Sequence, residues 1–527
     1  MKAELLNYPF ELVAPMAAIA SILLLPLGPL LIPRFYIIFL LVYFMCFLYT
    51  QVNHLFKFYI TAKKMTKTVR RWTDEEESAL YDDTQLIHAF IVPNYAEPEA
   101  LLRDTIKRLA NHKNAQTNYV IILAMEASEV NYQAKADNLT EYFKDSFLHF
   151  LVTAHPSDIP GEARGKGSNV AYAAKQGCTE LMQRGIDRKR VILTVSDSDS
   201  SIPELYIKEI EKAFNQAEDP YFLLFAPPIF FSRNCFEVPA AVRMTDITWS
   251  AMVMSSLSNS RGLSFPCSTY SLSMILAERV GYWDTDADSV GEDMHMMLKC
   301  FFKTDGLARC CPIFVPINLT NVQTNGYFAN LMARFVQAKR HYNGVADLAY
   351  TLKNSFGVQE DNHFATLTKK STHSAPYLDK LVMCIKVMEA HLIPTTSGWL
   401  MFAAVPLMQF ILFPPTPALA IVDPVDNPIL TSEFYASLWN IVKIITVFLP
   451  FPLFGTLAIY EHLHRTIDRE LYRKTETRTW RNVFDYISLP IAAWAFLTIP
   501  STIASIKRLY KTNDQYIVAE KFFEEDE

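Results

Sequence analysis

The stretch LTVSDSDSSIPELY, residues 193–206, decides the fold prediction. Its first residues, up to Val195, end an apolar run that is typical of a buried strand. Two carboxylates, Asp197 and Asp199, then stand two positions apart among serines, and Pro203 follows. Like charges at the end of a buried strand cost free energy through desolvation and mutual repulsion. A bound divalent cation removes that cost, so the stretch raises the hypothesis of a metal site at the edge of a sheet.

The sequence around this stretch alternates between short apolar runs and longer segments of helical spacing. The predicted strands are LIHAFIVPNY, NYVIILAMEA, FLVTAH and RVILTVSD, and the segments between them, including 128–150, predict helices. Strands that alternate with helices indicate an α/β fold in which helices cover both faces of a parallel sheet. Ligands of such sheets bind beyond the carboxyl ends of the strands.

Polar side chains follow several of the predicted strands at that edge. Asn94 and Tyr95 follow the first strand, Glu126 ends the second, and the two aspartates follow the last. Mg²⁺ and Mn²⁺ take oxygen ligands and favour one or two carboxylates together with substrate phosphates. The spacing Asp197-x-Asp199 therefore predicts a site for a diphosphate and a metal, and the alternative is a solvated turn.

Lys166 lies in the segment EARGKGSNVAYAAK, where glycines flank it just before a predicted helix. A cation, flexible glycines and the amides of a helix N-terminus together favour an anion such as a phosphate. The spacing is not that of a Walker A loop. An ordinary loop followed by a helix cap is the alternative.

The segment DADSVGEDMHMMLKC places Glu292 and Asp293 at the start of an amphipathic helix. A carboxylate in this place suits a general base that takes a proton from an acceptor hydroxyl. Acidic residues also favour helix starts for electrostatic reasons alone. His295 is expected to pack or to lie on the helix surface rather than to bind a ligand.

The segment ARFVQAKRHYNG has helical spacing and carries Gln337, Arg340 and His341 on one face. The arginine offers a forked pair of donors to a diphosphate, and the other two side chains add donors. A basic surface patch is the alternative.

Composition points to a membrane protein. Of the 527 residues, 50% are hydrophobic and 13% aromatic, and the apolar residues are clustered. The net charge of −6 argues against a nucleic-acid partner. The eight cysteines are scattered without a C-x-x-C pair, which favours a reduced chain without structural zinc.

Five apolar segments are long enough to be candidate membrane spans. We expect two spans within 1–58, a cytosolic domain over 59–350 and interfacial helices over 351–392. About three further spans follow within 393–505, separated by a loop at 461–483, and 506–527 form an acidic tail. The individual segments are 12–32, 35–50, 393–413, about 436–458 and about 484–505.

Lysine and arginine near the spans predict the orientation. The segments KKMTKTVRR and EHLHRTIDRELYRKTETRTWR are basic, whereas 414–433 has neither lysine nor arginine. The N-terminus, 59–392 and 461–483 are therefore expected in the cytosol and 414–433 outside. Five spans would place the tail outside as well, but Lys507, Arg508 and Lys511 speak against that.

The order of these motifs resembles that of the membrane-integrated family 2 glycosyltransferases, to which cellulose, chitin and hyaluronan synthases belong. The motifs are IVPNYAEP, an acid after the second strand, GKGSN, DSDSSIP, GED and QAKRH. The resemblance covers roughly 84–345 and the flanking helices, and LAMEA and GEDMHMMLKC are similar to a fungal-type branch. It implies a GT-A (Rossmann-like) domain that uses a UDP-sugar with Mg²⁺ or Mn²⁺.

The resemblance also implies residue roles. Asp293 would be the base, next to Glu292, and Asp197 and Asp199 would hold the diphosphate and the metal. The nucleotide pocket would consist of Asn94, Tyr95, Glu97, Glu126, Lys166 and Asp197. The residues that contact the acceptor and the diphosphate would be Cys267 and Ser268 of FPCSTYSL, together with Gln337, Arg340 and His341.

Two positions depart from the family pattern. Glu126 replaces the usual aspartate, and His341 stands where processive synthases carry tryptophan. The implied reaction is inverting transfer of a hexose to a growing polysaccharide, such as a cell-wall polymer at the plasma membrane, with or without translocation of the chain. The alternatives are transfer of a single sugar to a lipid, as in ceramide glucosyltransferases, and a non-catalytic nucleotide-sugar sensor or transporter.

Overall fold

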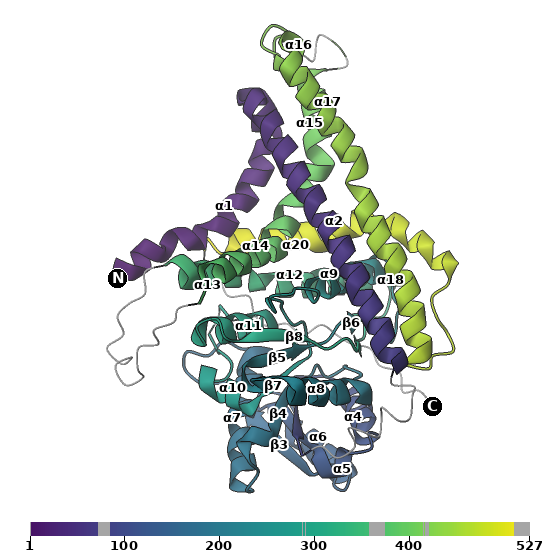
Figure 1. Cartoon of the computed structure of the whole chain (residues 1–527). Helices are drawn as coiled ribbons and strands as arrows, with labels where there is room; N and C mark the ends of the chain where they lie inside the picture. The colour runs from purple at the N-terminus through teal and green to yellow at the C-terminus, as the bar shows by residue number, and fades with distance from the viewer. Residues whose placement is uncertain are drawn as a thin grey trace.

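The computed structural model describes residues 2–71, 85–357 apart from 287 and 290, 375–414, 416 and 421–510. A sheet domain forms one end of the molecule, and long helices rise from it at the other end (Figure 1). The sequence-based expectations for the acidic tail beyond 510, and for 358–374 of the predicted interfacial region, fall outside the described residues.

The sheet has seven strands in the order β3-β2-β1-β4-β7-β5-β8. The predicted α/β fold class is confirmed, but the sheet is mixed, because β7 runs antiparallel to both of its neighbours. Its first residue, Tyr270, pairs with Val195 at the end of β4, so the segment that enters β7 meets the segment that leaves β4. The strand bounds are β1 Ile87–Pro93, β2 Tyr119–Glu126, β3 His149–His155, β4 Val191–Val195, β5 Leu223–Ala226, β7 Tyr270–Ser273 and β8 Arg309–Pro312.

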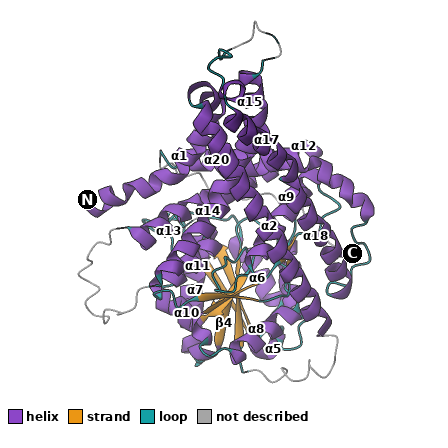
Figure 2. Cartoon of the chain, turned by 45° about the horizontal axis from the view of Figure 1, so that its top comes forward, coloured by secondary structure: helices purple, strands orange, loops and turns teal. Residues whose placement is uncertain are grey.

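Helices cover both faces of the sheet, which appears in orange within them in Figure 2. Along β1, Ala89 and Ile91 face one core, while Phe90 and Val92 face the other, as the two-residue period of a strand requires. Helices α7 (Lys166–Gln183), α10 (Met274–Val280) and α11 (Glu292–Lys303) pack on the first face. On the second face lie α4 (Glu99–Ala110), α6 (Tyr132–Tyr142) and α8 (Glu204–Gln216).

The helix predicted over 128–150 is shorter in the structure, where α6 ends at Tyr142 and β3 begins at His149. A second, two-stranded sheet joins β6 (Ile229–Phe230) to β9 (Ile317–Asn318). Ser201 bridges to Asn318, which brings the segment after β4 next to the segment after β9. The sheet domain is completed by α5 (Ala115–Asn118), α9 (Ala240–Ser256), α12 (Tyr327–Tyr342) and α13 (Ala346–Phe356).

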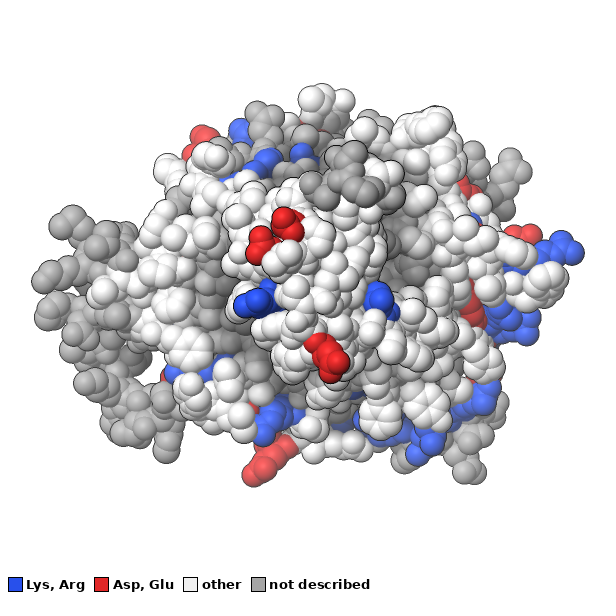
Figure 3. Space-filling model, turned by 90° about the horizontal axis from the view of Figure 1, so that it is seen from above, with Lys and Arg blue, Asp and Glu red and all other residues white. Residues whose placement is uncertain are grey.

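Five segments of the described chain are long and apolar enough to cross a membrane by length and composition. Helix α2 packs along α17 and α18, whereas α14 and α20 lie across the molecule between the upper helices and the sheet domain (Figure 1). Seen from above, most of the visible surface is uncharged; acidic and basic side chains stand near the centre of the view, and others lie toward the rim (Figure 3). The bounds are α1 Lys2–Leu31, α2 Pro33–Arg71, α14 Tyr377–Trp399, α15 Val405–Leu412, α16 Pro428–Thr431, α17 Glu433–Phe448, α18 Pro450–Glu470, α19 Leu489–Ala493 and α20 Ile499–Lys507.

Candidate active site

The candidate site lies beyond the carboxyl ends of β1 and β4. These two strands are parallel neighbours in the sheet. After β1 the chain continues to β2, which lies on one side of β1, whereas β4 lies on the other side. In open α/β sheets, ligands bind beyond the carboxyl ends of the strands at such a switch in strand order. The loop after β1 carries Asn94 and Tyr95, and the loop after β4 carries Asp197 and Asp199.

Lys166 at the start of α7 joins two carboxylates from different parts of the chain. Its Nζ lies 2.6 Å from Oδ1 of Asp197 and 2.7 Å from Oε1 of Glu292. Burial alone would lower the pKa of Lys166, but these two partners hold it well above its ordinary value, so the amine stays charged. Burial raises the pKa of Glu292 to about 7 against the effect of Lys166, and Asp293 contributes to the rise.

Ser268 connects the first aspartate of the D-x-D stretch to the predicted base. Its backbone N–H donates to Oδ2 of Asp293 at 2.9 Å, and its hydroxyl donates to Oδ2 of Asp197 at 2.5 Å. Oδ1 of Asp293 accepts a second backbone hydrogen bond, from Met294 at 2.8 Å in the first turn of α11. Ser268 has a φ of 64°, a left-handed conformation that is uncommon for serine and concentrates at functional sites.

Asp199 contacts a different set of residues. Its side chain is buried, and Oδ2 accepts hydrogen bonds from the backbone N–H of Thr320 at 3.3 Å and from the Thr320 hydroxyl. Its backbone oxygen accepts from Nη1 of Arg233 at 2.5 Å, and Nη2 of the same arginine donates to Asp104 at 2.5 Å. Sequence analysis did not single out Thr320 or Arg233, because neither belongs to a motif near the aspartates.

The residues predicted for the nucleotide pocket divide into two networks. In the first, Asn94 donates to Oε2 of Glu129 at 2.6 Å, and Lys135 pairs with the same carboxylate. The backbone N–H of Tyr95 donates to Oε2 of Glu97 at 2.6 Å. The Oδ1 atom of Asn94 is buried and accepts no hydrogen bond within the described part of the chain. This amide oxygen is thus available to a donor from a ligand.

In the second network, His155 lies between two carboxylates. Its Nδ1 is 3.1 Å from Glu126, and its Nε2 is 2.9 Å from Glu162. Burial opposes protonation, yet both carboxylates together raise the pKa of His155. Glu126, predicted to contact the nucleotide, is therefore paired with a histidine that no motif indicated.

Helix α12 presents its predicted residues next to α9. Oε1 of Gln337 accepts from Nη1 of Arg334 at 2.8 Å, and that arginine pairs with the buried Asp246 of α9 at 2.9 Å. The ring of His341 lies 6.2 Å from the ring of Trp249, centroid to centroid. Desolvation by the surrounding protein, and then Arg340 and Arg334, hold the pKa of His341 well below its ordinary value.

Trp249 also donates from Nε1 to the Sγ atom of Cys267 at 3.3 Å. Since Cys267 precedes Ser268, one tryptophan connects α12 to the group around Lys166. Burial, and then the charge of Asp293, raise the pKa of the Cys267 thiol above its usual range. The structure thus gathers Lys166, Asp197, Glu292, Asp293, Cys267, Ser268 and His341 in one region.

A second group of buried charges lies behind the start of α11. Nδ1 of His295 is 2.6 Å from Asp347 of α13, and its Nε2 is 3.0 Å from Asp284. Asp284 is also paired with Lys299 at 2.6 Å. His295, two residues after the predicted base, is therefore a buried ionic contact, which is more than the packing residue expected from the sequence.

One family model matches a part of the chain that includes much of this site. A family model described as "Glycosyl transferase family group 2" matches residues 192–422, which include both aspartates, Ser268, Asp293 and His341. No curated protein matches the chain.

Solved structures similar to the chain include the following two. The first is the mannosyltransferase PcManGT from Pyrobaculum calidifontis in complex with GDP-Man and Mn2+, at 15% identity and a TM-score of 0.39, over 78% of this chain and 99% of that one. The second is TarS from S. aureus, at 10% identity and a TM-score of 0.33, over 72% of this chain and 55% of that one.

The family match covers the region from β4 to the segment beyond α15, and the sheet around it is of the mixed α/β type. Long apolar helices flank that region at both ends. Residues 192–422 therefore match a glycosyltransferase family 2 model, and helices long and apolar enough to cross a membrane lie before and after them.

Proposed function

We propose that the chain transfers a hexose from a UDP-sugar to a growing polysaccharide, with inversion at the anomeric carbon. The observation that supports this most is the connection of Lys166, Asp197 and Asp293 through Ser268. It puts a cation for a diphosphate next to a carboxylate that two backbone amides hold in place. Transfer takes place at the cytosolic membrane face, most naturally of the plasma membrane, where a polymer can be exported.

Asp293 acts as the base in this proposal. The amides of Ser268 and Met294 fix its carboxylate, and each oxygen keeps a second lone pair that can take the proton of the acceptor hydroxyl. The hydroxyl oxygen then bonds to the anomeric carbon, and the bond from that carbon to the UDP oxygen breaks with its electron pair on the diphosphate. Glu292 is buried and paired with Lys166, so it positions that lysine rather than reacting itself.

Lys166 and the N-terminal amides of α7 would neutralise the departing diphosphate. Arg340, with Gln337 and His341 on the same helix, would contact it or the acceptor from the side of α12. Asn94, Tyr95, Glu97 and Glu126 would surround the nucleoside.

A divalent ion fits the donor set of this region. The described residues hold no group of three or more His, Cys, Asp or Glu side chains arranged for a metal. Mg²⁺ and Mn²⁺ need only one or two carboxylates when phosphates and water complete their shell, and Asp197 and Asp199 would supply those. Such an ion, when bound, contributes positive charge that stabilises the diphosphate.

The test is transfer of a radiolabelled sugar by the purified full chain, after a screen of UDP-sugars and GDP-mannose for nucleoside diphosphate release. We expect Asp293→Asn to lower kcat by about 10²–10⁴-fold, the usual contribution of a general base, with little change in KM. Asp137→Asn, an exposed aspartate on α6, is the matched control and should behave as the wild type. Unchanged transfer by Asp293→Asn would refute the role of this carboxylate.

A single transfer to a lipid acceptor is the second candidate. It is favoured by His341, which stands at the position of the tryptophan in processive members of the family. The length of the product separates the two candidates, because a ladder of products supports the polymer and one addition supports the lipid. A chain that neither transfers nor hydrolyses any donor would instead be a nucleotide-sugar sensor or transporter.

A further inference from the structure

The last apolar segment, residues 480–507, is long and apolar enough to cross a membrane. It consists of a 3₁₀-helix at Trp480–Ser488, then α19, a π-helical turn at Trp494–Thr498, and α20. Its contacts at both ends, however, are with the glycosyltransferase domain.

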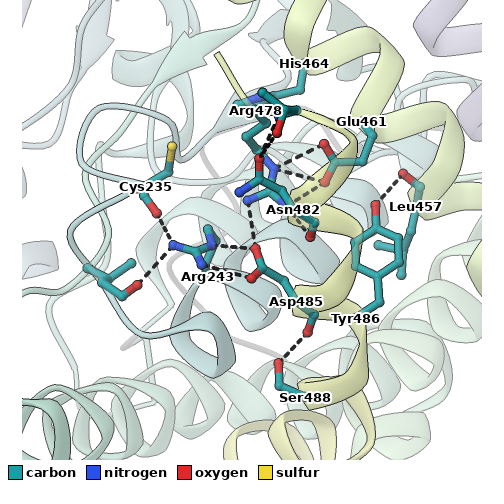
Figure 4. Close-up of polar contacts among 12 residues, drawn as sticks. Cys235, Arg243, Leu457, Glu461, His464, Arg478, Asn482, Asp485, Tyr486 and Ser488 are labelled. Carbon is teal, nitrogen blue, oxygen red and sulfur yellow. Dashed lines mark hydrogen bonds and ion pairs between the residues drawn. The ribbon is translucent and has the colours of Figure 1, made fainter. Parts of the chain in front are cut away.

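The beginning of the segment is attached to α9 by buried ion pairs (Figure 4). Both oxygens of Asp485 accept from Arg243 of α9, at 2.8 and 3.0 Å. Arg478, which is 1% exposed, donates to Glu461 and, at 3.2 Å, to Asp485. A buried arginine between two carboxylates resists displacement of the segment, because separating it from either partner would leave a buried charge unpaired.

The end of α18 and the loop just before the segment are attached to the same domain. The hydroxyl of Tyr472 donates to the backbone oxygen of Pro316 at 2.6 Å, and Asp468 accepts from Ser232 at 2.9 Å. Both partners lie next to the small sheet of β6 and β9. The loop predicted to be cytosolic therefore packs on the domain predicted to be cytosolic.

The other end of the segment returns to the domain. Nη1 of Arg508 lies 2.6 Å from Asp288, in the loop that precedes Glu292, and Nη2 lies 2.8 Å from Glu11 of α1. Helix α20 also packs against α12, which carries Gln337 and Arg340. Arg508 thus anchors the end of the last helix to the loop that precedes Glu292 and to α1.

Geometry then decides between crossing and lying flat. A helical span rises about 1.5 Å per residue and needs about 20 residues to cross roughly 30 Å of hydrocarbon. A crossing between Asp485 and Arg508 would put these residues at opposite faces of the bilayer. Both contact one folded domain, which can occupy only one side.

The exposed surface of the segment matches a helix that lies in the interface. Trp480, Phe484, Ile487, Ile491 and Trp494 recur every three or four residues and are 41–76% exposed. The opposite side is held by Asp485 and by Tyr486, whose hydroxyl donates to Leu457 at 2.9 Å. Aromatic residues at the rim of an apolar stripe are typical of helices that lie at the level of the lipid headgroups.

We propose that residues 480–508 lie along the membrane surface on the side of the catalytic domain, with this stripe inserted in the lipid. Of the five candidate spans, four then cross the membrane. The proposal rests on the membrane location of the long helices and revises the expectation of three C-terminal spans. It places the start of the tail on the catalytic side, where Lys507 and Arg508 agree with the preference of cationic residues for the cytosol.

The side of residue 510 can be tested by labelling cysteine variants with a membrane-impermeant maleimide in sealed vesicles. Tyr510→Cys is the probe, because Tyr510 is 73% exposed at the end of the described chain. Val130→Cys, in the loop after β2, marks the catalytic side, and Val425→Cys, between α15 and α16, marks the opposite side. The modified peptide is identified by its mass, so that native cysteines do not interfere.

We expect Tyr510→Cys to be labelled from the same side as Val130→Cys and protected on the side of Val425→Cys. Labelling together with Val425→Cys would overturn the proposal, because the segment would then cross.

The depth of the stripe gives a second measurement. Tryptophan fluorescence is quenched by lipids brominated either near the headgroup or near the chain end. Trp494 lies near the middle of the segment, so a spanning helix would place it at the bilayer centre. We expect Trp494→Phe and Trp480→Phe each to remove fluorescence that the headgroup-near bromine quenches. Loss of a component quenched mainly by the deep bromine in Trp494→Phe would contradict an interfacial position.

Discussion

His295 is the side chain whose replacement tests the electrostatics around the predicted base. It lies between Asp347, at 2.6 Å, and Asp284, at 3.0 Å, and is only 3% exposed. Burial opposes its protonation, but the two carboxylates raise the pKa of His295 to about 9 from 6.5. One pKa unit corresponds to about 1.4 kcal/mol, so the rise corresponds to about 3 kcal/mol of folding free energy.

The direction of the pH dependence follows from the sign of the shift. Since the pKa of His295 is higher in the folded than in the unfolded chain, the folded state holds the proton more tightly. This contribution is complete below pH 6.5 and is lost as the pH rises through about 9. The wild type should therefore lose stability over that range.

His295→Gln removes the titrating group and leaves Asp347 buried without a cation. At pH 6.5 we expect the variant to unfold roughly 6–12 °C below the wild type, given roughly 2–4 °C per kcal/mol for a domain of this size. The difference should shrink toward pH 9.5, where the wild type has lost its own contribution. The measurement is the thermal midpoint of the purified full chain in detergent, followed by tryptophan fluorescence.

His149→Gln is the matched control, because burial and Arg184 lower the pKa of His149 rather than raise it. Its stability should depend on pH between 6.5 and 9.5 as the wild type does. Equal slopes for the wild type and His295→Gln would refute the reasoning, since the ion pair would then contribute nothing that depends on the proton.

Three further substitutions test other contacts. Lys166→Met removes the counter-charge of two carboxylates and should lower the free energy of unfolding by about 3–5 kcal/mol at pH 8, as measured by urea titration. The loss should be smaller at pH 5, because Glu292, whose pKa is about 7, is then protonated. Gly398→Val should lower the thermal midpoint, because a Cβ at Gly398 would collide with the side chain of Thr498 and force α14 away from the last segment. Thr320→Val removes a hydroxyl donor to Asp199 and should raise the Mn²⁺ concentration for half-maximal transfer several-fold. The control Thr179→Val, at an exposed position of α7, should leave that concentration unchanged.

The strands and the approach of Lys166 to Asp197 could be predicted, because both depend on short-range pattern and on one rule of topology. Apolar runs predict β1, β2 and β4, and parallel strands bring the residues that follow them to one edge. The antiparallel β7 could not be predicted in the same way, since YSLS is short and not strongly apolar. The pairing of β7 with β4 places Ser268, just before β7, next to Asp197. The contact between Ser268 and Asp197 therefore depends on tertiary structure.

Spacing alone could not predict the direction of Asp199. Residues two apart point to the same side only while the chain is extended, and β4 ends at Val195, before either aspartate. A turn over residues 198 and 199 then directs the second carboxylate to Thr320. The partner comes from the segment after β9, about 120 residues later in the chain. Only the docking of the small sheet brings the two together.

The last helix shows why hydropathy alone does not distinguish a spanning segment from an interfacial one in the C-terminal region. A window average counts apolar residues along a segment, but a spanning helix and an interfacial helix can have the same average and differ in which residues face lipid. The distinction lies in the polar residues at the two ends. In the sequence, Asp485 and Arg508 resemble the ordinary charged residues that flank a span, yet each forms an ion pair with the catalytic domain. Because one of these pairs adjoins the loop before Glu292, the segment that hydropathy assigns to the membrane is also a support of the predicted catalytic helix.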